Sequence, residues 1–205
     1  MESDLRQRIT RPTVVDVAIT LADQGGPEAI SLSAVAQVLG CTSPSLYSHV
    51  QSVRDLMEAV STRCTHEFAD QLRDAVMGRS DEEGIRAFAG AWREYARTYP
   101  SRYAAVLRPS GGQEEERKQA AAHAIRAGES VLLSLGVEQQ DLAVASIVFR
   151  SILQGFSQIE KEIDAGALTV DQADETFGYL MEILIGGIRR RVRSELDGPV
   201  AQDVA

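Results

Sequence analysis

Residues 31–56 read SLSAVAQVLGCTSPSLYSHVQSVRDL, and this stretch decides the fold of the first quarter of the chain. Ser31 precedes a short run of helical apolar periodicity, so it is a good N-cap for a helix over residues 32–39. Gly40 follows where a helix needs a left-handed residue to end. Thr42 is placed as a second N-cap immediately afterwards. The stretch therefore predicts two short helices joined by a tight turn.

The second helix is predicted to be about two turns long. Pro44 lies in its first turn, where a missing N–H costs little, and Leu46 and Val50 face the core. That orientation leaves small and polar side chains on the outside: Ser43, Pro44, Ser45, Tyr47, Ser48 and His49. Two short helices joined by a glycine-containing turn form the helix-turn-helix motif, whose second helix reads the major groove of DNA.

The run LGCTSPSLYSHV, residues 39–50, resembles the signature of the TetR family of transcriptional regulators. It has the leucine and glycine, the cap, the leucine–tyrosine pair and the histidine before a hydrophobic residue. The resemblance implies that Tyr47 and His49 contact phosphate oxygens and that residues 53–77 form a long connecting helix. Val53 stands where the family usually carries a lysine, so one phosphate contact is missing, and Arg54 lies next to it.

The remaining DNA-contacting candidates lie around the same motif. Serines and Pro44 would contact base edges or thymine methyl groups, while other groups would position the protein on the phosphates. The full set of expected DNA-binding residues is Arg11, Ser31, Ser33, Thr42, Ser43, Pro44, Ser45, Tyr47, Ser48, His49 and Arg54. Two alternatives stay open: Tyr47 as an aromatic that packs the small domain, and His49 as a merely exposed residue.

The charge balance predicts modest DNA affinity for each subunit. The chain has 205 residues, a net charge of −9 and a pI near 4.9, which argues against a general nucleic-acid coat protein. Residues 1–57 contain few cations: Arg6, Arg8, Arg11 and Arg54. Because each phosphate contact adds about −0.9 to the log–log salt slope, few contacts are expected, and dimeric avidity must supply the rest.

Gly and Pro punctuate a series of helical periods, and strand patterns are nearly absent. Further helices are expected over residues 11–23, 53–77, 81–99, 100–108, 113–135, 141–164 and 170–193. The predicted fold is all-α: a three-helix helix-turn-helix domain (1–52), then a helical-bundle domain for ligand binding and dimerisation (53–194). Residues 195–205 are expected to be a disordered tail.

The C-terminal half resembles a TetR-type ligand-binding domain that is named for a tryptophan, a histidine and a glycine. The similarity lies in WREYARTYPSRY (92–103) and FRSILQGFSQIE (149–160), with Gln154 where the histidine usually stands. Aromatic residues with polar tips would line a cavity for an apolar or aromatic small molecule. The candidate ligand-binding residues are Phe88, Trp92, Tyr95, Tyr99, Tyr103, Phe149, Leu153 and Phe156. An ordinary core is the alternative.

The last two expected helices carry more apolar surface than one helical layer can hide, which suits a four-helix interface between two subunits. The candidate dimerisation residues are Val148, Ile152, Gly155, Ile159, Phe177, Leu180, Met181, Leu184 and Ile188. The alternative is a core within one subunit.

Signals for other classes of protein are weak. The N-terminus has no apolar signal core, and Arg150 and Glu182 interrupt the apolar stretches, so no membrane span and a cytoplasmic location are expected. Cys41 and Cys64 fit a reducing compartment as small packed residues. The histidines lie in separate predicted helices, and residues 64–67 project in different directions, so no metal, cofactor or catalytic centre is expected.

The function predicted is that of a ligand-responsive homodimeric repressor. Two recognition helices would occupy successive major grooves about 34–36 Å apart on a palindromic operator, and a small molecule would release it. The first alternative is a helical protein that binds a small molecule or a partner and has lost effective DNA binding. A small α-helical enzyme is the second.

Overall fold

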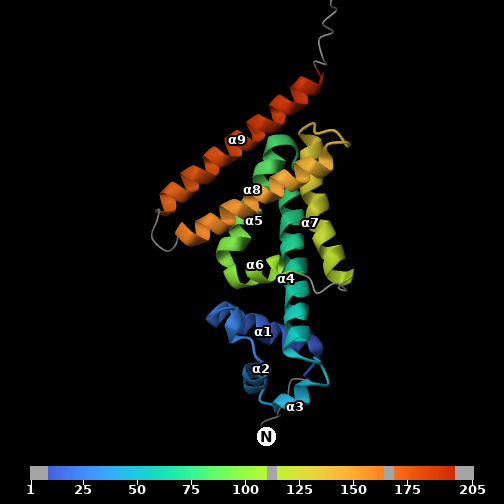
Figure 1. Ribbon diagram of the computed structural model, residues 1–205, viewed down its shortest axis with the longest axis vertical. Coiled ribbons are helices and arrows are strands. Elements are labelled where there is room, and N and C mark those ends of the chain that lie inside the picture. The colour runs from blue at the N-terminus through green and yellow to red at the C-terminus, as the bar shows by residue number, and fades with distance from the viewer. Residues whose placement is uncertain (1–8, 110–114, 164–168, 197–205) are drawn as a thin grey trace, which may run out of the picture. The chain divides into compact units, whose positions relative to one another are not determined.

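The structure is a computed structural model that describes residues 9–109, 115–163 and 169–196. Within these residues the chain forms nine α-helices and one 3₁₀ helix and contains no strand, so the predicted all-α fold is confirmed (Figure 1). The helices are α1 (Arg11–Gly25), η1 (Pro27–Ala29), α2 (Leu32–Val38), α3 (Ser43–Leu46), α4 (Val53–Val76), α5 (Asp81–Thr98), α6 (Pro100–Leu107), α7 (Glu115–Ser134), α8 (Leu142–Ile163) and α9 (Val170–Leu196).

Most helix ends lie within two residues of the prediction. Helix α9 continues to Leu196, so the expected tail begins with helical residues; 197–205 lie outside the described part. Asp81 is the first residue of α5 and has a φ of +51°, and the N–H of Gly84 donates to the carbonyl of Ser80 at 2.8 Å. The expected helix start at 113 and the loop at 110–112 also lie outside the described residues.

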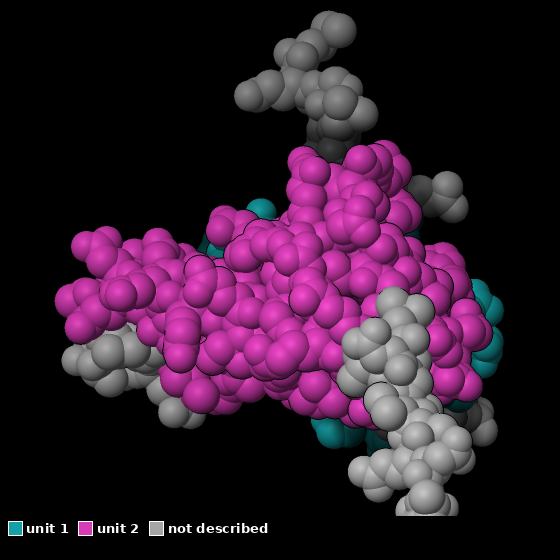
Figure 2. Space-filling model, turned by 90° about the horizontal axis from the view of Figure 1, so that it is seen from above, with its two compact units in different colours: residues 1–69, 98–121 teal, residues 70–97, 122–205 magenta. Residues whose placement is uncertain are grey.

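The chain divides into two compact units (Figure 2). The first comprises residues 1–69 and 98–121, and the second comprises residues 70–97 and 122–205. The unit that contains the helix-turn-helix is therefore larger than residues 1–52, because it also includes α6 and parts of α4 and α7. The boundary of the DNA-binding domain itself stays a prediction.

The first unit is built on one apolar cluster shared by α1, α2, α3 and the first half of α4. Its fully buried members include Val14, Val35, Leu46 and Leu56. Leu46 and Val50 face this core as the periodicity predicts, and Ala105 and Val106 of α6 pack against it. This packing fixes the short helix α3 from its apolar side and leaves its other side exposed.

The second unit is held together around Phe88 of α5. Its ring lies 5.2 Å from the ring of Phe149 on α8 and 6.1 Å from that of Trp92. Gly128 of α7 permits this approach, since a Cβ there would lie 3.1 Å from the Phe88 ring. Phe88 therefore joins α5, α7 and α8 in the aromatic core of the second unit.

Helix α8 is unusually apolar. Its segment Leu142–Lys161 has a mean hydropathy of 1.4 and is long and apolar enough to cross a membrane, although it contains Arg150. The expectation that this arginine excludes a span is therefore too strong on composition alone. One such helix is weak support for a span, because a core helix meets the same criterion. Here one side of α8 is buried in the second unit, where Glu160 is ion-paired to Arg93.

Candidate DNA-binding site

The turn of the helix-turn-helix is a Schellman motif centred on Gly40. Gly40 has φ +63°, as predicted for the residue that ends α2. Its N–H donates to the carbonyl of Gln37 at 3.2 Å, and the N–H of Cys41 donates to that of Ala36 at 3.0 Å. Both bonds satisfy carbonyls at the end of α2 that lack helical partners, and they turn the chain toward α3.

The recognition helix is shorter than predicted. Only Ser43–Leu46 is α-helical, and the next turn continues with Tyr47 N–H donating to the carbonyl of Pro44 at 3.3 Å. Serine hydroxyls compete for the backbone, since Ser45 Oγ donates to the carbonyl of Thr42 at 2.6 Å. Thr42 holds the N-cap position, as predicted, although its side chain makes no capping hydrogen bond.

Exposure around α3 supports its assignment as a contact surface. Tyr47 is 56% exposed and does not belong to the apolar cluster of the domain. The exposed side chains beside it are those of Thr42, Pro44, Ser45 and Ser48, while Ser43 and His49 are half-buried. The tyrosine ring is therefore available to a partner, and the core-packing alternative for Tyr47 is not what the structure has.

Arg11 has an internal partner that the sequence analysis did not identify. Its guanidinium forms a two-pronged pair with Asp55, at 2.9 and 2.7 Å, and donates to the carbonyl of His49 at 2.9 Å. Asp55 also accepts from the N–H of Gln51 at 2.8 Å. The hydrogen bonds from Arg11 lower the pKa of Asp55, and Asp55 raises the pKa of Arg11. This Arg11–Asp55 clamp ties α1 to the end of the recognition segment and to the start of α4.

The other residues expected to contact DNA differ in how many partners they have within the chain. Ser31 caps α2 by accepting from Ala34 N–H at 3.1 Å, and its hydroxyl lies 3.1 Å from that of Ser33. Arg54 is the exposed cation next to Val53, with 73% of its side chain accessible and Glu58 at 3.4 Å. Such a pair is weak in water, so Arg54 is available to a phosphate. Arg6 and Arg8 lie outside the described residues.

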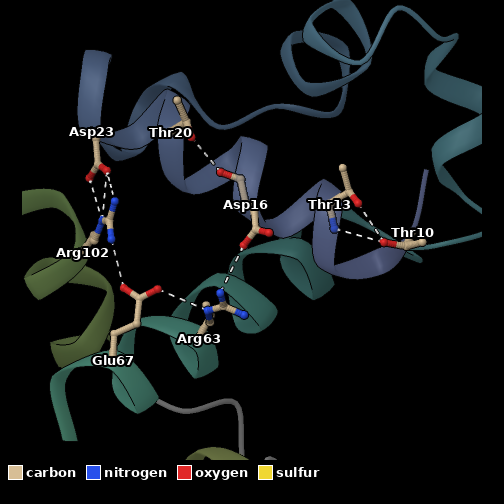
Figure 3. A network of polar contacts seen from close by, with 8 residues as sticks. All are labelled: Thr10, Thr13, Asp16, Thr20, Asp23, Arg63, Glu67 and Arg102. Atoms are coloured by element: carbon tan, nitrogen blue, oxygen red, sulfur yellow. Dashed lines mark hydrogen bonds and ion pairs between the residues drawn. The ribbon is translucent and has the colours of Figure 1, made fainter. Parts of the chain in front are cut away.

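A network of ion pairs connects α1, α4 and α6 within the first unit (Figure 3). Arg102 of α6 reaches Asp23 at 2.7 Å and Glu67 at 3.1 Å. Glu67 is also paired with Arg63 at 3.2 Å, and Arg63 lies 3.7 Å from Asp16 of α1. These acids raise the pKa of Arg102, chiefly through the hydrogen bonds to Asp23. The network attaches α6 to α1 and α4, which share the apolar cluster with the recognition helix α3. No sequence pattern predicted these ion pairs.

The expected ligand-binding aromatic residues are mostly core residues. Phe88, Trp92, Tyr95, Phe149, Leu153 and Phe156 are buried in the second unit. Tyr103 is buried in the first unit, 5.9 Å from the ring of Phe68, whereas Tyr99 is partly exposed and lies under the Arg102 guanidinium. The eight residues are thus divided between the two units, and their role in binding a ligand stays a prediction.

The expected dimerisation residues separate into buried and exposed groups. Met181 and Leu184 are buried within the single chain, and Phe177 packs on Phe156 with ring centres 5.3 Å apart. Val148 and Ile159 are exposed, as are Val144 and Ile147 on α8 and Tyr179 and Ile183 on α9. A groove of about 380 Å³ with Val144, Val148, Ile152 and Ile183 in its walls runs between α8 and α9. On α9 the groove is lined by the expected Leu184 and Ile188 and also by Ile183, which was not expected. The role of these residues in dimerisation stays a prediction.

The described residues contain no group of three or more His, Cys, Asp or Glu side chains that could hold a metal ion. Cys64 is buried, and desolvation, with the nearby charge of Glu67, raises the pKa of its thiol to about 12. Cys41 is half-buried in the turn, and no disulfide joins the two cysteines.

The chain is similar to known regulators over nearly its whole length. Residues 85–184 match the family model "Tetracyclin repressor-like, C-terminal domain". The chain is 32% identical over 185 residues to Rv0681, an HTH-type transcriptional regulator of Mycobacterium tuberculosis, covering 90% of this chain and 84% of that protein.

Solved structures share the fold. A variant of TetR from Acinetobacter baumannii AYE, in complex with minocycline, superposes with a TM-score of 0.67 at 22% identity, covering 91% of this chain and 99% of that one. BioQ with its double-stranded DNA operator gives 0.58 at 18% identity, with coverages of 89% and 99%. With the helix-turn-helix geometry, the similarity in sequence identifies this chain as a member of the TetR family of helix-turn-helix transcriptional regulators.

Proposed function

We propose that this protein is a homodimeric repressor that binds a palindromic operator in the cytoplasm and releases it when a small molecule binds the C-terminal domain. The observation that carries the proposal is the recognition segment. Pro44 and Ser45 are exposed on α3 and Tyr47 directly after it, while Arg11, paired with Asp55, donates to the carbonyl of His49 at the end of this segment. Prepositioned polar and aromatic groups on a short, rigid helix are what major-groove reading requires.

Dimerisation supports the proposal through the exposed apolar surface of α8 and α9. Ile147 and Ile183 are 57% and 52% exposed, which is costly for an isolated chain in water. A second copy packed on this surface would form a four-helix interface. Each subunit offers few cations to DNA, so two linked recognition helices would be needed for useful affinity.

Two printed names support the remaining parts of the proposal by similarity. BioQ is described with an operator, and the TetR variant with minocycline. Helix α6, which follows α5 after a single residue, is attached to α1 and α4 through Arg102. A ligand that shifts α5 would therefore change the position of α6 and, through Arg102, of α1. A differential affinity of a few kcal/mol between two conformers is enough for release.

The test is selection of binding sites from a random duplex DNA pool at moderate salt. The expected result is enrichment of a palindrome whose half-sites are about 34–36 Å apart, one helical turn. If no sequence is enriched, the proposal fails, and the alternative of a helical protein that binds a ligand or partner without DNA takes its place.

Substitution of Tyr47 tests the placement of the surface. Tyr47→Ala is expected to weaken binding to the selected site by about ten-fold or more, because a contact with the DNA backbone is lost. The fold should be unchanged, because the side chain is exposed. Tyr47→Phe is the matched control that keeps the ring and removes the hydroxyl. If Tyr47→Phe binds DNA as tightly as the wild type, the ring makes the contact; if it binds as weakly as Tyr47→Ala, the hydroxyl does. Wild-type affinity in Tyr47→Ala would place the DNA surface elsewhere.

A further inference from the structure

The buried side of α8 carries polar side chains at positions where a helix packed in a core normally has apolar ones. At alternating spacings of four and three residues, this α8 stripe consists of Ser146, Arg150, Leu153, Ser157 and Glu160. Ser146, Ser157 and Glu160 are buried with 5%, 7% and 5% exposure. Only Leu153 is apolar, and Phe149 and Phe156 flank the stripe.

Glu160 is explained by the fold. Its carboxylate accepts from Arg93 Nε at 2.9 Å and Nη2 at 2.5 Å, and Arg93 also reaches Asp174 at 2.7 Å. The Arg93 guanidinium lies 4.7 Å from the centre of the Phe177 ring. This end of the stripe joins α5, α8 and α9 and is satisfied.

Arg150 and Ser157 are not explained by the fold. The side chain of Arg150 is half-buried and that of Ser157 is buried. Among the described residues, the Arg150 Nε and Ser157 Oγ atoms are inaccessible and have no hydrogen-bond partner. Native proteins pair nearly all buried polar atoms, so an unpaired one calls for a water, an ion or a ligand. Two unpaired groups seven residues apart lie on the same side of one helix, separated by about 10 Å along its axis.

We infer that Arg150 and Ser157 form the polar part of the effector site, and that the effector is a small organic carboxylate with an apolar body. Its carboxylate binds the Arg150 guanidinium, and Ser157 hydrogen-bonds a second polar group farther along the molecule. This assignment rests on the proposed function, because a ligand bound here is an effector only if the protein is a ligand-responsive regulator. No sequence motif pointed to either residue.

The chemistry of the ligand follows from the side chains. The Nε edge of a guanidinium presents two parallel donors, which match the two oxygens of a carboxylate. A single arginine balances one negative charge, whereas a doubly charged phosphate would stay partly uncompensated in a buried place. The apolar body follows from Phe149, Leu153 and Phe156 around the stripe, with Phe88 packed on Phe149 at 5.2 Å.

The probe is octanoate, with octanamide as its neutral counterpart of the same shape. Trp92 is the single tryptophan of the chain and packs on Phe88, so its fluorescence reports binding in this unit without DNA. Octanoate is expected to give a saturable signal and to bind about ten-fold or more tightly than octanamide, because only the acid pairs with Arg150.

The matched variants are Arg150→Gln and Ser157→Ala. Arg150→Gln is expected to weaken octanoate about ten-fold and to leave octanamide nearly unchanged. Its thermal midpoint should equal or exceed that of the wild type, since a buried Nε–H without a partner is removed. The ligand 8-hydroxyoctanoate is expected to bind several-fold more tightly than octanoate, and Ser157→Ala is expected to abolish that difference.

Three results would overturn the inference: no saturable signal from either compound, equal binding of acid and amide, or an acid preference that persists in Arg150→Gln. A large drop in the thermal midpoint of Arg150→Gln, together with lost binding, would also overturn it by assigning Arg150 to the core. Enrichment of an operator without an acid preference would remove only this effector class. An acid preference without an operator would instead refute the proposed repressor and leave the carboxylate site standing.

Discussion

At the scale of single residues, Asp55 organises the recognition segment through its charge. It accepts hydrogen bonds from Arg11 and from the N–H of Gln51, and both lower its pKa. A carboxyl whose pKa is lower in the folded state stabilises the fold above its ordinary pKa of about 3.9, and loses that effect as pH falls through the lowered folded value. The clamp is therefore complete at neutral pH and is lost only in strong acid.

Asp55→Asn is expected to lower the free energy of unfolding at neutral pH by about 1 kcal/mol, a modest value because Arg11 is about half exposed. The difference from wild type should shrink as pH falls below about 4, where the native carboxyl is also protonated. Urea unfolding at a series of pH values measures this. Asp16→Asn is the control, since that carboxylate is exposed and lies 3.7 Å from Arg63. A difference that is constant with pH would show that the charge of Asp55 is not what stabilises the clamp.

The two cysteines are expected to differ in reactivity. Burial raises the pKa of Cys64 to about 12, so its thiolate is nearly absent at mildly alkaline pH. A thiol reagent should modify Cys41 in the folded protein and Cys64 only after unfolding. Cys41→Ser should then show no fast reaction. Rapid modification of Cys64 in that variant would mean that the core around it opens readily in the folded protein.

At the scale of elements, the turn between α2 and α3 depends on one residue with a left-handed backbone. Gly40→Ala is expected to cost about 1–2 kcal/mol of stability, because φ is +63° there although no atom obstructs a Cβ. Gly90→Ala is the matched control. A Cβ at Gly90 also meets nothing within 4 Å, but this glycine lies inside α5 with no positive φ, so alanine should stabilise the protein by about 0.5–1 kcal/mol. Thermal or urea unfolding of both variants separates backbone strain from packing. Equal changes in the free energy of unfolding would show that the left-handed backbone at Gly40 is not the cause.

At the scale of the whole molecule, the exposed surface of α8 and α9 is expected to hold two chains together. The double variant Ile147→Glu with Ile183→Glu should convert the dimer into a folded monomer, because charges would replace apolar groups at the interface. Light scattering after size-exclusion chromatography measures the mass, and circular dichroism checks the helical content. Met77→Glu, at another exposed apolar residue, should leave the mass unchanged. A variant that stays dimeric would show that the interface lies elsewhere.

The sequence alone determined the elements and the class of protein. Helix ends at Gly40 and Gly136 were predictable because backbone conformations with positive φ favour glycine, and caps are local chemistry. The apolar faces of α1, α2 and α4 were predictable because burial follows a 3.6-residue period. The sequence left Tyr47 open between a DNA contact and core packing, and the structure decided in favour of exposure.

Only the tertiary structure decided how polar groups are paired and which apolar groups are used inside the chain. Arg11 is 44 residues from Asp55, and Arg102 is 79 residues from Asp23, and no local pattern encodes such contacts. Met181 and Ile183 are apolar residues of the same helix α9, yet packing buries the first and exposes the second. The unpaired atoms of Arg150 and Ser157 likewise became visible only in three dimensions, because satisfaction of a buried donor depends on neighbours that are distant in sequence.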